Sequence, residues 1–292
     1  MPHPGKGFKV YDQLTYEDKQ KIKEMYYEHA TWDFIKNNIG VSRRAIKYTL
    51  ANDFDINTKR KRRYILDESY FSDINSEAKA YFLGLLLADG YVDAGKTNAV
   101  VVQVQESDGY ILETLTKEIQ FTGKLNYIQP RKDRYSQKGS YRLCFSSKRM
   151  SSDLYNLGFN RNKSTYLKGL PSISEHLTRH MIRGYFDGDG SVSKVVPDGD
   201  KRVLANGNVA YYDRQPCISI IGSEDLLLDI RKKINISINI TNGGLSDSKT
   251  NGLCYWKLSG GNNIRKIYRY FYDNATIYLK RKEEHIRPVI AP

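Results

Sequence analysis

AYFLGLLLADG at residues 80–90 and HMIRGYFDGDG at residues 180–190 form an internal repeat, one hundred residues apart. Both copies place a small residue, three large residues, a second small residue and then Asp-Gly in the same register. Small residues four positions apart share one face of a helix. A glycine inside a helix costs about 1 kcal/mol relative to alanine, so we expect compensation by unusually close packing of two helices. The residues of this predicted helix interface are Gly84, Ala88, Gly184 and Gly188.

Each copy of the repeat ends in an aspartate followed by a glycine. Gly90 and Gly190 are expected to stop the helices, which leaves Asp89 and Asp189 at two adjoining C-terminal tips. Two carboxylates beside the negative ends of two helix dipoles are unfavourable unless cations occupy the site. We expect Mg²⁺, with Mn²⁺ as a substitute, because hard cations prefer oxygen ligands.

A plainer interpretation is that Asp-Gly simply forms a turn after each helix. That interpretation fits one copy well, but two copies in one register count against it. Metal ions bound beside a basic surface can activate water and stabilise the leaving oxygen of a phosphodiester. The repeat therefore indicates phosphodiester chemistry.

The composition points to a polyanionic partner. Among 292 residues, 46 are basic and 33 acidic, giving a formal net charge of +13. A field of this sign attracts nucleic acid, although charge alone does not separate DNA from RNA or a membrane surface. No apolar run approaches the roughly 20 residues of a spanning helix, and no signal-peptide core is present. We therefore expect a soluble cytoplasmic protein without membrane partners, in which the widely spaced Cys144, Cys217 and Cys254 remain reduced thiols.

Residues 1–58 are predicted to form a small all-α domain. Thr15, Thr31 and Ser42 are placed to cap three short helices, and Gly40 stops the second one. GVSRRAIKYTL at 40–50 resembles the recognition helix of resolvase-type helix-turn-helix domains. This resemblance implies DNA contacts, whereas the alternative is a helical bundle with a solvated basic face. The side chains that would face phosphates or base edges are Arg43, Arg44 and Lys47.

Residues 59–75 are predicted to be a basic linker because they begin with the run KRKRR at 59–63. Such a run is either a solvated connection or a tether that lies along DNA phosphates or in a minor groove.

Alternating apolar residues after each repeat predict strands. Residues 100–105 and 142–146 alternate in this way in the first half, and Ser107 is expected to cap the helix between them. The second half repeats the order with strands near 218–220 and 255–259 and a helix capped by Ser223. We therefore expect two units of the same design, at 76–170 and 171–292.

FLGLLLADG at 82–90 and IRGYFDGDG at 182–190 resemble the paired motifs of LAGLIDADG homing endonucleases, and the resemblance extends over roughly residues 75–287. It implies an α+β fold in which two pseudo-symmetric αββαββα units form one chain. It also implies a monomer that makes a metal-dependent staggered double-strand break at a long asymmetric duplex site. Leu87 departs from the family pattern, in which this position varies and the final aspartate matters more.

The resemblance assigns roles to further residues. Asp89 and Asp189 would bind the metal and direct cleavage of one strand each. A lysine at the end of each unit would lie near the scissile phosphates, which by position gives Lys163 and Lys282. The neighbouring Lys280 and Arg281 leave the second assignment open.

DNA contacts are expected from the outward-facing residues of the strands. An insertion at 194–214 is either a hairpin reaching along DNA or a loop tip. The side chains predicted to contact DNA in these regions are Gln103, Gln105, Arg142, Lys194, Arg202, Tyr255 and Lys257.

Two other classes of protein stay open. LAGLIDADG domains with helix-turn-helix modules occur in a family of bacterial sporulation regulators that have lost the catalytic acids, whereas Asp89 and Asp189 are present here. An RNA-binding intron maturase is the other alternative. The helix-turn-helix favours duplex DNA because the major groove of A-form RNA is too narrow to be read.

Overall fold

The computed structural model divides the chain into two units, Met1–Arg63 and Tyr64–Pro292, which are considered separately. None of the helices it describes is long and apolar enough to cross a membrane. The described residues are 7–28, 30–56, 58, 64–130, 138–159, 167–193, 196–214, 216–240, 243–250 and 252–290.

The N-terminal unit packs its helices around a small apolar core. The hydroxyls of Thr15, Thr31 and Ser42 each accept a backbone N–H of the helix that follows, and Gly40 adopts the left-handed conformation with φ 71°. These caps and this stop confirm the helices predicted from the sequence. The elements are η1 (Tyr11–Gln13), α1 (Tyr16–Tyr27), α2 (Trp32–Ile39) and α3 (Arg43–Asn52). The buried core residues are Ile22, Ile35, Val41, Ile46 and Leu50.

The first half of the larger unit follows the order αββαββα. Its strands form one antiparallel sheet in the order β1-β2-β4-β3. The elements are α4 (Glu77–Asp89), β1 (Gly90–Asp93), β2 (Ala99–Gln105), η2 (Glu106–Asp108), α5 (Gly109–Glu118), β3 (Asn126–Ile128), β4 (Ser140–Ser146) and α6 (Lys148–Asn156).

The second half repeats this order with two additions. Its sheet has the matching order β5-β8-β10-β9, which confirms the predicted fold class of two αββαββα units. The repeated elements are α8 (Glu175–Asp189), β5 (Gly190–Ser193), β8 (Cys217–Gly222), α9 (Glu224–Ile238), β9 (Gly244–Asp247), β10 (Cys254–Ser259) and α10 (Gly261–Tyr272). The additions are the hairpin β6 (Val196–Val203) and β7 (Val209–Arg214) within the predicted insertion, and the terminal helix α11 (Lys280–Ile290).

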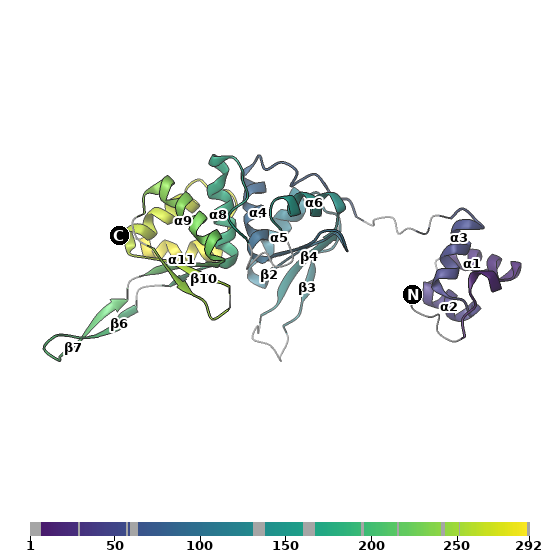
Figure 1. The fold of residues 1–292 in the computed structure, drawn as a ribbon, viewed down its shortest axis with the longest axis horizontal. Helices are drawn as coiled ribbons and strands as arrows, with labels where there is room; N and C mark the ends of the chain where they lie inside the picture. The colour runs from purple at the N-terminus through teal and green to yellow at the C-terminus, as the bar shows by residue number, and fades with distance from the viewer. Residues whose placement is uncertain are drawn as a thin grey trace. The chain divides into compact units, whose positions relative to one another are not determined.

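The strand registers align the two halves residue by residue. Gly90 lies opposite Val102 in the first sheet, and Gly190 lies opposite Ile220 in the second. Figure 1 shows the helices gathered on one side of the two sheets. The inward residues of β2, which include Val102, are buried beneath these helices, so the alternate residues lie on the outer face.

Three local features differ from the sequence prediction. Residues 64–75, expected to belong to the linker, pack on the core of the larger unit, where Tyr70 and Phe71 are buried. The linker was predicted from the basic run at 59–63, but the two aromatic rings that follow it bury enough apolar surface to hold this segment on the core. Ser107 does not cap α5, because η2 intervenes and the N-cap is Asp108. Ser223 is the N-cap of α9, but its hydroxyl donates to the Leu167 carbonyl instead of accepting from the helix.

Candidate functional site

The two repeat helices cross at the predicted glycines. A methyl group on Gly84 would overlap the carbonyl oxygen of Met181, and one on Gly184 would overlap the carbonyl oxygen of Tyr81. Each glycine therefore meets the residue three positions before the other glycine. This reciprocity places a local two-fold axis between α4 and α8, with their backbones in contact.

The close approach continues to the C-terminal tips of both helices. A methyl group on Gly188 would overlap the Cβ of Ala88 and would lie 3.0 Å from Oδ2 of Asp89. The Asp89 carboxylate therefore lies against the end of α8, beside the residue that precedes Asp189. The fold thus brings together the two aspartates that the sequence singled out.

Gly90 and Gly190 end the helices, as expected, without a left-handed backbone. Their backbones are nearly identical, with φ −89° and ψ 157° at Gly90 and φ −87° and ψ 157° at Gly190. Because neither φ is positive, the left-handed freedom of glycine is not required. A side chain would instead collide with the last helical turn, at Leu86 and at Phe186.

The pKa of Tyr185 is affected by the negative charge at the two helix tips. Its hydroxyl donates to the Ile221 carbonyl at 2.9 Å. Burial raises the pKa of Tyr185, and the negative charges of Asp189 and Asp89 raise it further. Both carboxylates therefore lie close enough to affect the same hydroxyl. Their negative charge adds to the negative potential at the C-terminal ends of α4 and α8.

The donor set at the tips fits Mg²⁺. Within the described residues, no cluster of three or more His, Cys, Asp or Glu side chains is placed to hold a metal. Mg²⁺ is commonly held by one or two carboxylates and completes its coordination with water and phosphate oxygens. Asp89 and Asp189, which are exposed and half-buried, offer such a set.

Lys282 reaches the same region from α11. Its buried ammonium group donates to the carbonyl oxygen of Gly190, the residue that follows Asp189, and lies 5.7 Å from the centre of the Phe186 ring. Burial lowers the pKa of Lys282, and the nearby charge of Arg281 lowers it further. This lysine is therefore a desolvated cation beside the tip of α8.

The other basic residues of this segment point elsewhere. Lys280 lies 5.3 Å from the Tyr110 ring centre, and Arg281 pairs with Asp108 at 3.0 Å. Among the three basic residues at 280–282, Lys282 is thus the one that lies beside the tip of α8. Lys163, its predicted counterpart, lies outside the described residues.

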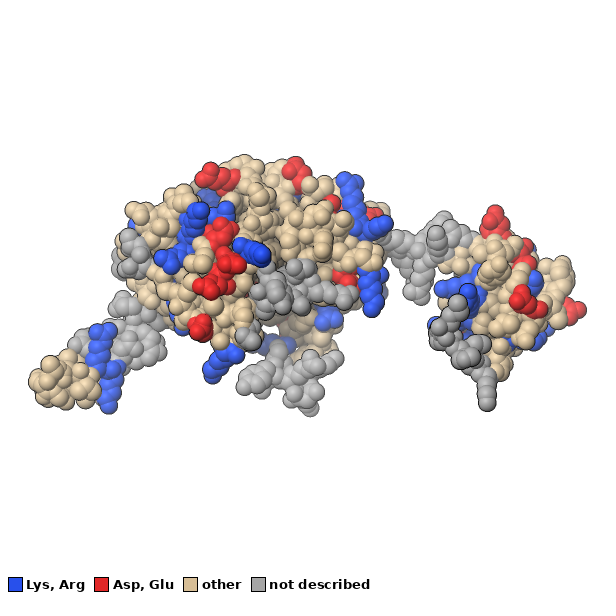
Figure 2. Space-filling view, in the orientation of Figure 1, with Lys and Arg blue, Asp and Glu red and all other residues tan. Residues whose placement is uncertain are grey.

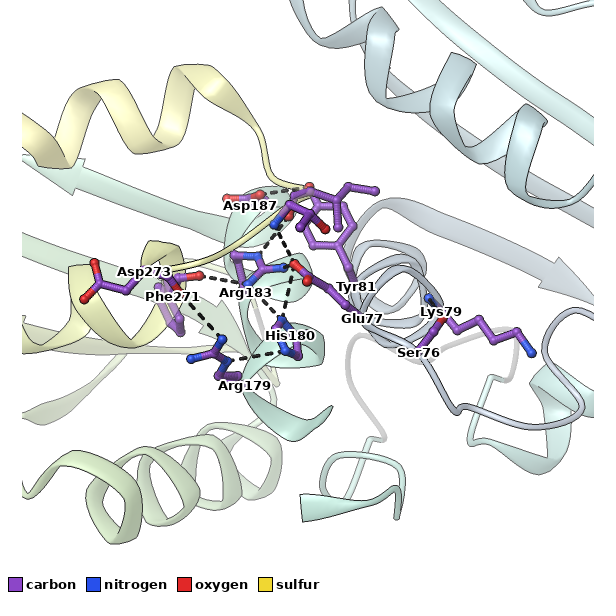
Figure 3. Close-up of polar contacts among 12 residues, drawn as sticks. Ser76, Glu77, Lys79, Tyr81, Arg179, His180, Arg183, Asp187, Phe271 and Asp273 are labelled. Carbon is purple, nitrogen blue, oxygen red and sulfur yellow. Dashed lines mark hydrogen bonds and ion pairs between the residues drawn. The ribbon is translucent and has the colours of Figure 1, made fainter. Parts of the chain in front are cut away.

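A buried carboxylate behind the tip was not predicted from the sequence. Asp187 is fully buried and accepts from the Tyr81 hydroxyl at 2.8 Å (Figure 3). It also accepts from the Tyr272 hydroxyl at 3.1 Å and from the Leu279 backbone N–H at 2.7 Å. Burial raises the pKa of Asp187 to about 6. Since Leu279 directly precedes α11, Asp187 fixes the start of the helix that carries Lys282.

Arg183 extends this buried network along α8. Its guanidinium donates to Glu77 of α4 at 2.6 Å, to the Phe271 carbonyl at 2.8 Å and to the Ile277 carbonyl at 3.0 Å (Figure 3). It also donates to Nδ1 of His180 at 3.0 Å. Burial lowers the pKa of His180 to about 4, and the Arg183 charge acts in the same direction. The available sequence signal was the spacing of Arg183 and Asp187, which lie four residues apart and therefore share one face of α8.

The predicted contact residues of the first half lie on the outer face of its sheet. Gln103 and Arg142 are directly opposite each other, and Oε1 of Gln103 accepts from Nε and Nη2 of Arg142 at 3.0 and 2.7 Å. Gln105 instead donates to Asp108 at 2.9 Å. Gln103 and Arg142 therefore bind each other, whereas Gln105 is hydrogen-bonded to the N-cap residue of α5.

In the second half, Tyr255 and Lys257 also face outward on β10, and the Lys257 ammonium lies 5.5 Å from the Tyr255 ring centre. Arg202 is exposed on the added hairpin, where Figure 2 shows a group of basic side chains. Lys194 lies outside the described residues.

The basic residues of α3 differ in whether they form an ion pair within the N-terminal unit. Arg43 forms an ion pair with Asp33 of α2. Arg44 and Lys47 are exposed, and the Lys47 ammonium lies 5.9 Å from the Trp32 ring centre. Two of the three predicted contact residues of this helix are therefore presented to solvent without an ion pair to a described residue.

Comparisons with known proteins give structural similarities. No family model and no curated protein sequence matches the chain. It is similar to the LAGLIDADG meganuclease I-AabMI bound to uncleaved DNA, with 12% identity, a TM-score of 0.46, and 72% of this chain and 87% of that one covered. It is also similar to the I-SmaMI LAGLIDADG homing endonuclease bound to cleaved DNA, with 16% identity, a TM-score of 0.45, and coverage of 73% and 87%. These values are low, so a function has to be inferred from the geometry of this chain.

Proposed function

We propose that this chain is a site-specific DNA endonuclease of the LAGLIDADG homing type. The observation that carries the proposal is the placement of Asp89 and Asp189 at adjoining ends of two helices whose backbones touch. These two carboxylates belong to a chain with a net charge of +13. A basic protein with a paired acidic centre fits a phosphodiester substrate.

Asp89 and Asp189 would hold Mg²⁺, for which Mn²⁺ could substitute, each directing cleavage of one strand. A divalent cation there would neutralise phosphate charge and favour attack by water. Lys282 would add positive charge beside the phosphate, because its ammonium already lies at Gly190, next to Asp189. Lys163 would serve the other strand, as the resemblance implies.

The substrate would be a long asymmetric duplex bound by one copy of the chain. The two halves share a topology but carry different outward residues, so each would bind a different half-site. The outward residues Gln103, Arg142, Tyr255 and Lys257 support contacts in the centre, and Arg202 supports contacts from the hairpin. Arg44 and Lys47 of α3 would extend binding to phosphates or bases outside the centre.

The test is cleavage of a randomised duplex library in Mg²⁺. The intact chain is expected to cut reproducibly at one long site and to leave a staggered break. The variant that carries both Asp89→Asn and Asp189→Asn should still bind the selected duplex but should not cut it. A matched control removes the same negative charge from exposed positions of α5 and α9, with Glu113→Gln and Asp225→Asn, and should cut normally.

Cleavage by the double aspartate variant at the rate of the intact chain would contradict the assignment of these carboxylates. Selective retention of duplexes without any cleavage by the intact chain would favour a DNA-binding regulator instead. Those two failures are distinguishable because binding and cleavage are measured on the same library.

A further inference from the structure

Three polar side chains form a connected set on the outer face of the first sheet. Gln103 lies opposite Arg142 in the register of β2 and β4, and Ser140 precedes Arg142 by two residues on the same strand. The amide nitrogen of Gln103 donates to the Ser140 hydroxyl at 2.8 Å. Its amide oxygen must therefore face Arg142, from which it accepts two hydrogen bonds.

This arrangement fixes one edge of the Arg142 guanidinium and leaves the other edge open. A guanidinium has five N–H donors, of which Gln103 occupies one on Nε and one on Nη2. The parallel pair of donors on Nη1 and Nη2 has no acceptor among the described residues. Arg142 is exposed, so this pair of donors is accessible on the outer face.

A fixed pair of parallel donors is complementary to one base edge. Guanine presents O6 and N7 side by side in the major groove, and arginine binds them with two parallel hydrogen bonds. A phosphate accepts the same fork, but a phosphate contact gains nothing from orientation relative to a base plane. The bracing of Arg142 by Gln103 supplies such an orientation, because it removes the rotational freedom of the guanidinium.

The equivalent position of the second half has different chemistry. Because Val102 and Ile220 occupy equivalent registers, the pair equivalent to Gln103 and Arg142 is Ile221 and Tyr255. Neither of these side chains carries a charge or a fork of donors. An apolar and aromatic pair is suited to a thymine methyl group instead.

We propose that Arg142, positioned by Gln103, reads a guanine in the half-site bound by the first half, and that the symmetry-related base pair is not read by this means. This deepens the proposed function and rests on it. Arg142 makes the contact, whereas Gln103 acts through Arg142. The two half-sites are therefore expected to differ in base sequence at this position, in addition to any difference outside the centre of the site.

The experiment selects bound duplexes from a randomised library with the full chain carrying Asp89→Asn and Asp189→Asn, so that cleavage does not deplete the pool. One position is expected to prefer guanine by roughly 5- to 100-fold over other bases. Adding Arg142→Gln should abolish this preference or shift it to adenine, at that position alone. Gln103→Ala should weaken the same preference, and Gln103→Glu, which keeps an acceptor for Arg142, should restore it.

Tyr255→Phe serves as the control on the second half and should leave the guanine preference unchanged. If Arg142→Gln lowers affinity equally for all duplexes with unchanged base preferences, Arg142 contacts phosphate and the inference is overturned. If Gln103→Ala and Gln103→Glu behave alike, the positioning role is overturned. A chain that enriches no duplex would overturn the proposed function itself, which is a different outcome from either.

Discussion

The helices α4 and α8 are alike where they touch and unlike behind the contact. Gly84 and Gly184 meet each other's backbones reciprocally, and both helices end in Asp-Gly. Behind this shared surface, α4 has apolar residues at three positions where α8 carries buried polar side chains. The pairs of equivalent residues are Ala80 and His180, Leu83 and Arg183, and Leu87 and Asp187.

This difference separates two requirements of the fold. Close contact of the helices needs small residues on both sides and therefore constrains both halves equally. The polar side chains of α8 instead hold residues 271–279, which lead into α11 and Lys282. In the second half, hydrogen bonds from α8 thus hold the segment that leads into α11. Substitutions that exchange equivalent residues of α4 and α8 test this interpretation.

The largest effect is expected from Arg183→Leu, which gives α8 the residue that α4 has. The variant leaves the half-buried Glu77 without its ion-pair partner and two carbonyl oxygens without their donor. Removal of one partner of a buried ion pair costs about 3–5 kcal/mol. Urea unfolding followed by circular dichroism should show this loss in the free energy of unfolding.

Leu83→Met is the matched control in the first half, because it changes a buried side chain of similar volume and should cost less than about 1.5 kcal/mol. An Arg183→Leu variant as stable as the intact chain would mean that the polar network contributes nothing beyond what an apolar core provides.

The next effect tests the equivalence of the two halves. Gly84→Ala and Gly184→Ala should each cost about 3 kcal/mol, because the added methyl group overlaps a backbone carbonyl that can move only if the helices separate. The symmetric geometry predicts equal losses, measured by thermal or urea unfolding.

Gly261→Ala is the control for this pair. Gly261 is helical, and a methyl group there would meet no atom within 4 Å, so the variant should be neutral or slightly stabilising. Unequal losses at Gly84 and Gly184 would break the two-fold equivalence of the crossing.

Much of the fold follows from the sequence, because the repeated glycines and the alternating strands have local signatures. The paired aspartates follow for the same reason, since Asp89 and Asp189 occupy one register of the repeat. The network of Arg183 and Asp187 does not follow. A hydrophobic pattern assigns charged residues to the surface, and their partners near Leu279 lie about ninety residues away in the chain. Only the fold brings them together.

The pH dependence of stability separates His180 from its counterpart, Ala80. The folded-state pKa of His180, about 4, lies below the ordinary value of 6.5. Between these values the unfolded chain binds a proton that the folded chain does not, so stability is lost as the pH falls from about 6.5 to 4. Between pH 7 and pH 4.5 this shift lowers the free energy of unfolding by roughly 2–3 kcal/mol. Urea unfolding at pH 7 and pH 4.5 should show the loss.

His180→Gln is the comparison variant because it keeps an acceptor for Arg183 but does not titrate. Asp187, whose pKa is raised to about 6, acts in the opposite sense, since its contribution falls as the pH rises from about 4 to 6. Both proteins contain Asp187, so its effect cancels in the difference. If the intact chain and the variant lose stability in parallel, His180 is not the group responsible.

The smallest effect concerns the helices that follow the last strand of each half. The Ser147 hydroxyl accepts the Met150 backbone N–H and caps α6, whereas the N-cap of α10 is Gly260, which has no side chain to cap the helix. Ser147→Ala should therefore cost about 1 kcal/mol in the free energy of unfolding. Ser152→Ala, at an exposed position of the same helix, is the control and should cost nothing. If the two variants unfold at the same urea concentration, this difference in capping has no energetic consequence, and the asymmetry that matters lies in the buried polar residues of α8.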